Sequence, residues 1–170
     1  MKLPRYIFIF ILMLSHKAFA CDCESLGAFL KVASETEFVA LVKVTRYLTF
    51  KDIDGKRTPM SMEVEIIDIY KGKETRKTII VWGDNGALCR PYLSRFNQGQ
   101  YYVIAFYKCK TDDYFISNCG DYWLNADIKK QIAIGSVTEN QSQITLIDLK
   151  EKLLVIDNKI NDTVKNQKNK

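Results

Sequence analysis

Histidine is almost absent from this 170-residue sequence. The only one, His16, lies within the first twenty residues, just after an apolar run. A chain that loses this segment has no imidazole for Ser-His-Asp or Cys-His catalysis, and none for a zinc site. The sequence also lacks a C-x-x-C motif, which argues against a zinc ribbon. We therefore expect a protein that is not an enzyme and has no cofactor of its own.

An excess of positive charge is missing from the body of the chain. The whole sequence has 25 Lys and Arg against 20 Asp and Glu. Much of this excess lies in residues 1–20 and in NKINDTVKNQKNK (158–170), and the part between them has 18 bases and 19 acids. Nucleic-acid binding needs a basic patch on the folded body, so we expect no nucleic-acid partner. Residues 158–170 are interpreted as a disordered basic tail, with contact to an anionic surface as the alternative.

The first twenty residues have the pattern of a secretory signal peptide. Lys2 and Arg5 precede the apolar run Tyr6–Leu14, and Ala18–Ala20 has the small-x-small form of a cleavage site. This run is far shorter than the roughly 20 residues that span a bilayer. We expect cleavage before Cys21, secretion to the periplasm or outside the cell, and no stable membrane insertion afterwards. A short retained anchor is one alternative. Lipoprotein processing is another, although the bulky centre of the cleavage tripeptide argues against it.

Beyond this segment, the pattern is mainly that of a β protein. Helices are expected only near the two ends, over Ser25–Glu35 and Ile144–Ile156, where apolar residues recur at helical spacing. Between them, β-branched and aromatic runs predict five strands, with an Asp54-Gly55 turn after the first. The five are Glu37–Phe50, Ser61–Gly72, Lys77–Gly83, Gln100–Lys108 and Asp113–Cys119. This spacing predicts a small closed or partly open barrel with flanking helices.

Five cysteines follow the signal: Cys21, Cys23, Cys89, Cys109 and Cys119. Export to an oxidising compartment favours disulfides, and an odd number leaves at least one cysteine without an intramolecular partner. The residues alone leave the pairing open.

An ordered set of motifs covers about residues 21–126. A C-x-C pair is followed by Ala28-Phe29 and then by FVALVKV, EVEIIDIYKGKE, NGALC, GQYYVIAF and FISNCGDYW. In order and spacing, this set resembles the tissue inhibitors of metalloproteinases. The resemblance implies a netrin-like domain over residues 21–157, with an OB-like five-stranded barrel and flanking helices.

The resemblance also implies a disulfide pattern. It pairs Cys21 with Cys89 and Cys23 with Cys119, and it leaves Cys109 unpaired. A third bridge of the family is missing, because Leu30 stands where one of its cysteines would be. For Cys109 two readings stay open: an idle thiol, or a disulfide between two chains that makes a dimer.

The function implied by the resemblance is inhibition of a zinc metalloprotease. The free amine and the carbonyl oxygen of Cys21 would chelate the catalytic zinc of the target in trans, at the position that such enzymes keep open. An α-amino group titrates near 7.7–8.0, so part of it is neutral and able to donate its lone pair at physiological pH. Cys21, Asp22 and Cys23, with Ala87 and Leu88 beside them, would form the inhibitory wedge.

Asp22 departs from the family pattern. Active members have a small or hydroxyl-bearing residue at this position, and it enters the specificity pocket of the protease. Burial of an unpaired carboxylate there costs several kcal/mol. The sequence therefore leaves an alternative function: a netrin-like module that binds a protein and inhibits no protease.

Overall fold

The computed structural model describes residues 23–168, which form an eight-stranded sheet and two α-helices. The elements in chain order are α2 (Phe29–Glu35), β1 (Phe38–Ile53), β2 (Lys56–Lys71), β3 (Thr78–Trp82), the short 3-10 helix η1 (Leu93–Arg95), β4 (Tyr101–Lys108), β5 (Tyr114–Phe115), β6 (Trp123–Asp127), β7 (Ile132–Thr138), β8 (Gln141–Thr145) and α3 (Leu146–Lys168). The fold is mainly β, as the sequence predicts.

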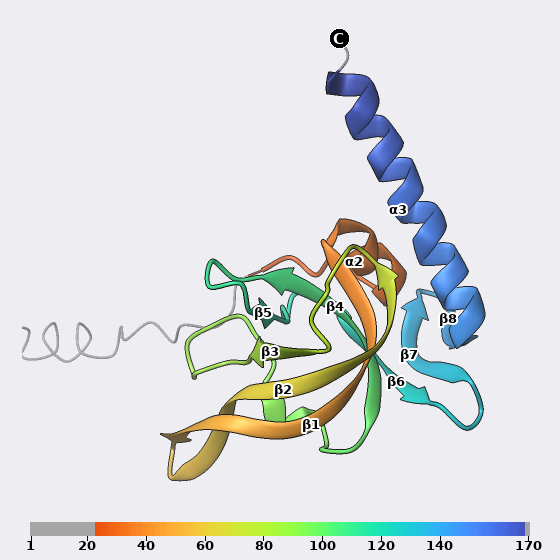
Figure 1. The fold of residues 1–170 in the computed structure, drawn as a ribbon. Helices are drawn as coiled ribbons and strands as arrows, with labels where there is room; N and C mark the ends of the chain where they lie inside the picture. Colours follow the sequence, from red (N-terminus) through yellow and green to blue (C-terminus); the bar gives the residue numbers. More distant parts are fainter. Residues whose placement is uncertain (1–22, 169–170) are drawn as a thin grey trace, which may run out of the picture.

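Five of the strands form a partial ring. Their order is β1-β2-β3-β5-β4, and pairing of β1 with β4 joins the two ends. Figure 1 shows this ring in the middle of the molecule. Its weakest part is β5, which pairs with β3 and with β4 through only two residues each. The expected barrel-like arrangement of five strands is therefore present, and each expected strand overlaps one of these five.

Three further strands were not predicted. β6 pairs with β4 beside the ring, and β7 and β8 continue the sheet outward from it. Gly135 interrupts the pattern of β7, because its φ of +151° is rare for other residues and an added Cβ would lie 2.8 Å from Leu124 Cδ2. β8 buries only Ile144. Neither strand therefore has a clear alternation of apolar and polar residues.

The β1–β2 hairpin extends beyond the ring as a long two-stranded arm (Figure 1). Its end is the expected turn: Asp54 and Gly55 have φ of +52° and +73°, and Gly55 N donates to Asp52 Oδ1 at 2.9 Å. Register shifts along the pair mark β-bulges, which increase local twist and bend the arm.

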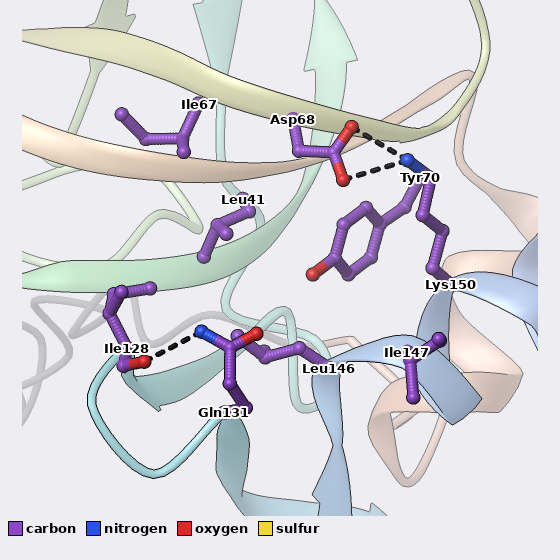
Figure 2. Close-up of a pocket in the computed structure, with 9 residues that line it drawn as sticks. All are labelled: Leu41, Ile67, Asp68, Tyr70, Ile128, Gln131, Leu146, Ile147 and Lys150. Atoms are coloured by element: carbon purple, nitrogen blue, oxygen red, sulfur yellow. Dashed lines mark hydrogen bonds and ion pairs between the residues drawn. The ribbon is translucent and has the colours of Figure 1, made fainter.

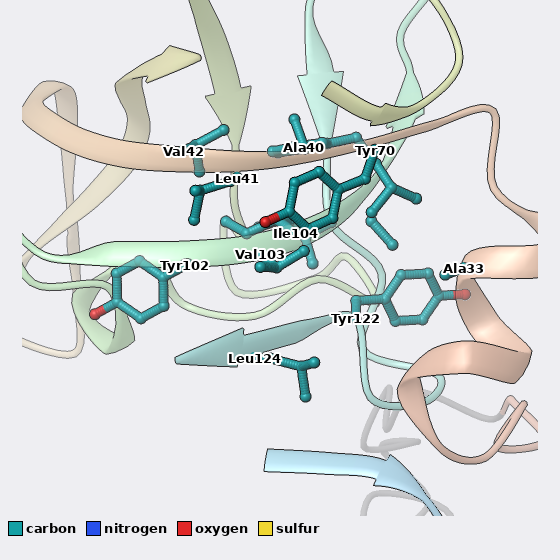
Figure 3. Packing of buried hydrophobic residues seen from close by; sticks show 14 of the residues in the cluster. Ala33, Ala40, Leu41, Val42, Tyr70, Tyr102, Val103, Ile104, Tyr122 and Leu124 are labelled. Atoms are coloured by element: carbon teal, nitrogen blue, oxygen red, sulfur yellow. The ribbon is translucent and has the colours of Figure 1, made fainter. Parts of the chain in front are cut away.

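The core lies inside the ring and between the ring and the elements that cover it. β1 buries five consecutive residues, Phe38–Val42, and β4 buries Tyr102–Phe106. Consecutive burial means that both faces of these strands are covered, because side chains alternate between the faces. Figure 3 shows part of this packing, with Ala33 from α2 close to Tyr122.

A buried lysine joins α2 to the sheet. Lys71 Nζ donates to the carbonyl oxygens of Ala33, Ser34 and Thr36 at 3.0, 2.8 and 2.6 Å. These groups lie at the end of α2, where helical carbonyls lack intrahelical partners. Burial lowers the pKa of the Lys71 ammonium.

The C-terminal helix packs on the sheet through one apolar stripe. Leu146, Leu149 and Leu153 are buried and Ile156 is partly buried, which confirms the amphipathic pattern expected there. The structure differs from the sequence prediction in length. α3 continues to Lys168, through the segment expected to be a disordered tail (Figure 1). Residues 158–168 contain neither proline nor glycine, so no helix-breaking residue ends the helix earlier.

Candidate functional site: the end of the molecule that carries the cysteines

A disulfide joins the start of the described chain to the segment that follows β5. Cys23 is bonded to Cys119, 96 residues later, with a Cα–Cα distance of 5.8 Å. This is the pair that the resemblance implied. Close by, Leu26 N donates to the carbonyl oxygen of Cys119 at 2.9 Å, and Asp121 N donates to that of Gly27 at 3.0 Å. The segment before α2 is thus held against residues 119–121 by one covalent bond and two hydrogen bonds.

The loop between β3 and η1 reaches the same place. Asn118 N donates to the carbonyl oxygen of Cys89 at 3.0 Å, so Cys89 lies beside the residue that precedes Cys119. The Arg90 guanidinium lies 4.3 Å from the ring centre of Phe115, which supports the loop from β5. Two segments that are 66 positions apart in the sequence, at Cys23 and Cys89, therefore meet at residues 118 and 119.

Asp84 determines the shape of this loop. Its Oδ1 accepts hydrogen bonds from the backbone amides of Gly86, Ala87 and Leu88, at 2.9, 3.1 and 2.9 Å. Gly86 has a φ of +94°, which suits glycine in such a tight turn. A single carboxylate thus orients three successive amides. The sequence analysis did not identify this role, although Asp84 stands in the turn-forming stretch Asp84–Gly86.

Ala87 and Leu88, two residues of the predicted wedge, are exposed on this loop. Leu88 keeps 37% of its surface accessible. The tip of the β1–β2 arm contacts the loop. Lys51 Nζ donates to Asn85 O at 3.2 Å, and the Ile53 side chain lies near Gly86. The loop is therefore held in place while its apolar tip faces solvent.

Of the other wedge residues, Cys23 is exposed and forms the disulfide with Cys119. Cys21 and Asp22 lie outside the described residues. Cys89 is disulfide-bonded, but the expected Cys21–Cys89 pairing involves Cys21 and so stays a prediction.

Cys109 is a free, half-buried thiol. Its backbone amide donates to Asp113 O at 2.7 Å, at the turn between β4 and β5. Burial raises the pKa of the thiol, which disfavours the reactive thiolate. The dimer through Cys109 stays a prediction.

A charged cluster, which the sequence did not reveal, supports the connection between β2 and β3. The Glu74 carboxylate is 7% exposed and forms an ion pair with Arg76, with Oε2 2.6 Å from Nη2. It also accepts from Tyr114 Oη at 2.8 Å and from the backbone amides of Thr75 and Arg76. The guanidinium of Arg76, followed by the other donors, holds the pKa of Glu74 far below its usual range. This cluster holds the β2–β3 connection against β5, the strand of the ring with the fewest paired residues.

The described part of the chain contains no group of three or more His, Cys, Asp or Glu side chains arranged to hold a metal ion. Among residues 23–168, no helix combines the length and apolar character needed to cross a membrane.

No protein-family model matches the chain, and no curated protein matches it significantly.

Proposed function

We propose that this protein is a secreted inhibitor of zinc metalloproteases, similar to the tissue inhibitors of metalloproteinases. In this proposal the partial ring is an OB-type barrel of a netrin-like domain, and the chain is neither an enzyme nor the holder of its own zinc. The Cys23–Cys119 bridge is compatible with an oxidising compartment outside the cytosol.

One observation carries the proposal: the segment at Cys23 and the exposed loop tip at Ala87 and Leu88 are anchored to adjacent residues. Cys23 is bonded to Cys119, and the Cys89 carbonyl accepts from Asn118 N. A chain that starts at Cys21 has only two residues before this anchor. Its amine therefore stays within a short reach of the loop.

The chemistry of a zinc protease fits such a surface. The catalytic metal keeps one coordination position for water or substrate, and a neutral amine with its neighbouring carbonyl oxygen is able to occupy it. A wedge that is ordered before binding loses little conformational entropy when it binds. The disulfide, the Asp84 hydrogen bonds and the supporting arm provide this order.

The test starts from the secreted protein. Intact mass and N-terminal sequencing should give a chain that begins at Cys21 with an unmodified amine. The same sample should then inhibit at least one member of a panel of zinc endopeptidases, with serine proteases as the matched negative panel. A lipid on Cys21, or any residue before it, contradicts the chelation mechanism.

The charge of Asp22 favours a second candidate, a netrin-like module that binds a protein without inhibiting a protease. This candidate predicts a correct Cys21 terminus together with no inhibition across the whole panel. It also predicts that Asp22→Thr gives no inhibition, because the surface would then serve a different partner.

A further inference from the structure

Oppositely charged side chains meet in two different ways in this molecule. In the hollow between β2 and the start of α3, Asp68 and Lys150 are joined to each other, as Figure 2 shows, with Nζ 2.7 Å from both carboxylate oxygens. Asp84 and Lys51 instead contact the two ends of one peptide group, in the loop between β3 and η1. Their charges therefore act on the backbone between them.

This peptide group belongs to Asn85-Gly86, the only Asn-Gly pair in the sequence. Both residues are exposed, so water reaches them. In such a pair the backbone nitrogen of the glycine is able to attack the side-chain amide of the asparagine. Glycine permits the close approach because it has no Cβ. The rate of this reaction depends on the groups that surround the pair.

The attacking nitrogen is prepared from both ends of its peptide group. Lys51 Nζ, on the β1–β2 arm, donates to Asn85 O at 3.2 Å. A positive charge there favours loss of the proton from the same peptide. Gly86 N donates this proton to Asp84 Oδ1 in a hydrogen bond of 2.9 Å. A carboxylate is thus in place to accept the proton when the nitrogen attacks.

The group under attack, the side-chain amide of Asn85, is folded back over the same peptide. Its Oδ1 accepts from Ala87 N at 3.1 Å, which places the side-chain carbonyl beside the backbone of Gly86. Attack on this carbonyl puts negative charge on Oδ1, and an amide donor aimed at that oxygen stabilises the charge. The loop therefore holds the nucleophile, the proton acceptor and the electrophile together.

We propose that Asn85 is a site of intramolecular deamidation, with Asp84 as the base. The Gly86 nitrogen forms a bond to Asn85 Cγ, and its proton passes to the Asp84 carboxylate. The Cγ–Nδ2 bond breaks, and the leaving amide takes up that proton and departs as ammonia. Water then opens the succinimide at either carbonyl, which gives aspartate or isoaspartate at position 85.

The product changes the loop. Isoaspartate continues the main chain through the former side chain, so the backbone becomes longer just before Ala87 and Leu88. Their amides then no longer fit the carboxylate of Asp84 as they do in the unmodified loop. The reaction itself requires no inhibition of a protease, so it is tested separately from the proposed function.

The test follows the secreted full chain at neutral pH by peptide mass spectrometry, with chromatography to separate aspartate from isoaspartate. Asn85 should convert about tenfold faster in the folded protein than in the same chain unfolded in guanidinium chloride, because only the fold assembles the reacting groups. Asn97, Asn125 and Asn140 are internal controls in the same samples. None of them precedes a glycine, and they should stay unchanged.

Variants test the two charged groups. Asp84→Asn keeps an acceptor oxygen and removes the base, so it should slow conversion of the folded protein about tenfold. Lys51→Ala should slow it several-fold, and Lys51→Arg, which keeps the positive charge, should restore the rate. In guanidinium chloride all these proteins should convert at the wild-type rate, because the groups are then dispersed.

Two results overturn the proposal. They are conversion of Asn85 that is no faster in the folded than in the unfolded chain, and an unchanged rate in folded Asp84→Asn. If Asp84→Asn does not fold, Lys51→Ala replaces it, because the Lys51 side chain is exposed. An unchanged rate in folded Lys51→Ala also overturns the proposal.

Discussion

At the scale of single residues, Asp84 connects backbone geometry most directly to the proposed activity. Its carboxylate is the common acceptor of three amides, and those amides precede or belong to the exposed pair Ala87-Leu88. Hydrogen bonds to a charged acceptor are stronger than those between neutral groups. The direction of the loop tip therefore depends on one side chain.

We predict that Asp84→Ala weakens inhibition of a target zinc protease about tenfold. The expected loss of unfolding free energy is only about 1 kcal/mol, because the loop lies at the surface. Inhibition constants and urea unfolding of the same preparations measure the two effects. Asp84→Asn, which keeps one acceptor oxygen, should lie between wild type and Asp84→Ala. Full inhibition by Asp84→Ala would show that the loop shape is irrelevant to the activity.

Asp22 gives a prediction with the opposite sign. Binding buries the side chain at position 22, and an unpaired carboxylate is costly to desolvate whereas a hydroxyl is much less so. Asp22→Thr should therefore strengthen inhibition about tenfold or more. Asp22→Asn is the matched control, since it removes the charge and keeps the size. Inhibition constants of the three proteins against one protease decide the point, and equal or weaker inhibition by Asp22→Thr counts against the wedge.

Glu74 predicts a dependence of stability on pH. Its pKa in the folded protein lies below the ordinary value of about 4.3, so folding is favoured by its ionised form. This contribution is complete above the pKa of the unfolded chain and is lost as the pH falls below it. Glu74→Gln should therefore cost about 1–3 kcal/mol at pH 7, and the difference from wild type should shrink between pH 5 and pH 3. Urea unfolding across this range measures it, and a difference that does not change with pH rules out the ionised cluster as the cause.

Among single residues, the sequence predicted the roles that follow from the residue type itself. It predicted the Asp54-Gly55 turn, and the resemblance implied the Cys23–Cys119 bridge. It did not reveal the role of Glu74, because that role depends on Tyr114, which lies 40 positions away in the chain.

At the scale of elements, α3 is held to the sheet by two kinds of contact. Leu153 is fully buried in the stripe, while the Lys150–Asp68 pair lies at the surface with side chains 35% and 42% exposed. Burial of an apolar side chain contributes more than an exposed ion pair, which is screened by water and salt.

We therefore predict that Leu153→Ala destabilises the protein by about 2–5 kcal/mol. Lys150→Ala should cost less than about 1 kcal/mol. Thermal and urea unfolding of both variants provide the comparison, with the exposed Leu154→Ala as the matched apolar control. A larger effect of Lys150→Ala than of Leu153→Ala contradicts this view of how α3 is attached.

Strands and helices were predictable from the sequence where their burial produces a regular pattern or a long run of apolar residues. β1, β2 and β4 contain long apolar and β-branched runs, and the α3 stripe repeats at helical spacing. β8 is an edge strand with one buried residue, so its pairing with β7 is decided by the sheet beside it rather than by its own composition.

At the scale of the whole molecule, the ring brings together segments that no local pattern connects. Closure of β1 on β4 and the Cys23–Cys119 bridge place the segment at Cys23 beside the loop at Cys89. Composition and periodicity do not predict this proximity; it was expected only from the resemblance. The central claim is that this proximity serves to present a free α-amine to a metal.

The most direct test compares two forms of the protein against one zinc endopeptidase that the Cys21 form inhibits. The first form begins at Cys21, and the second carries one additional alanine before it, with both disulfide patterns checked by mass spectrometry. Because only the first form has its free amine on Cys21, two residues before the Cys23 anchor, the added alanine should weaken inhibition by about a hundredfold or more. Equal inhibition by the two forms would contradict chelation of the zinc by Cys21.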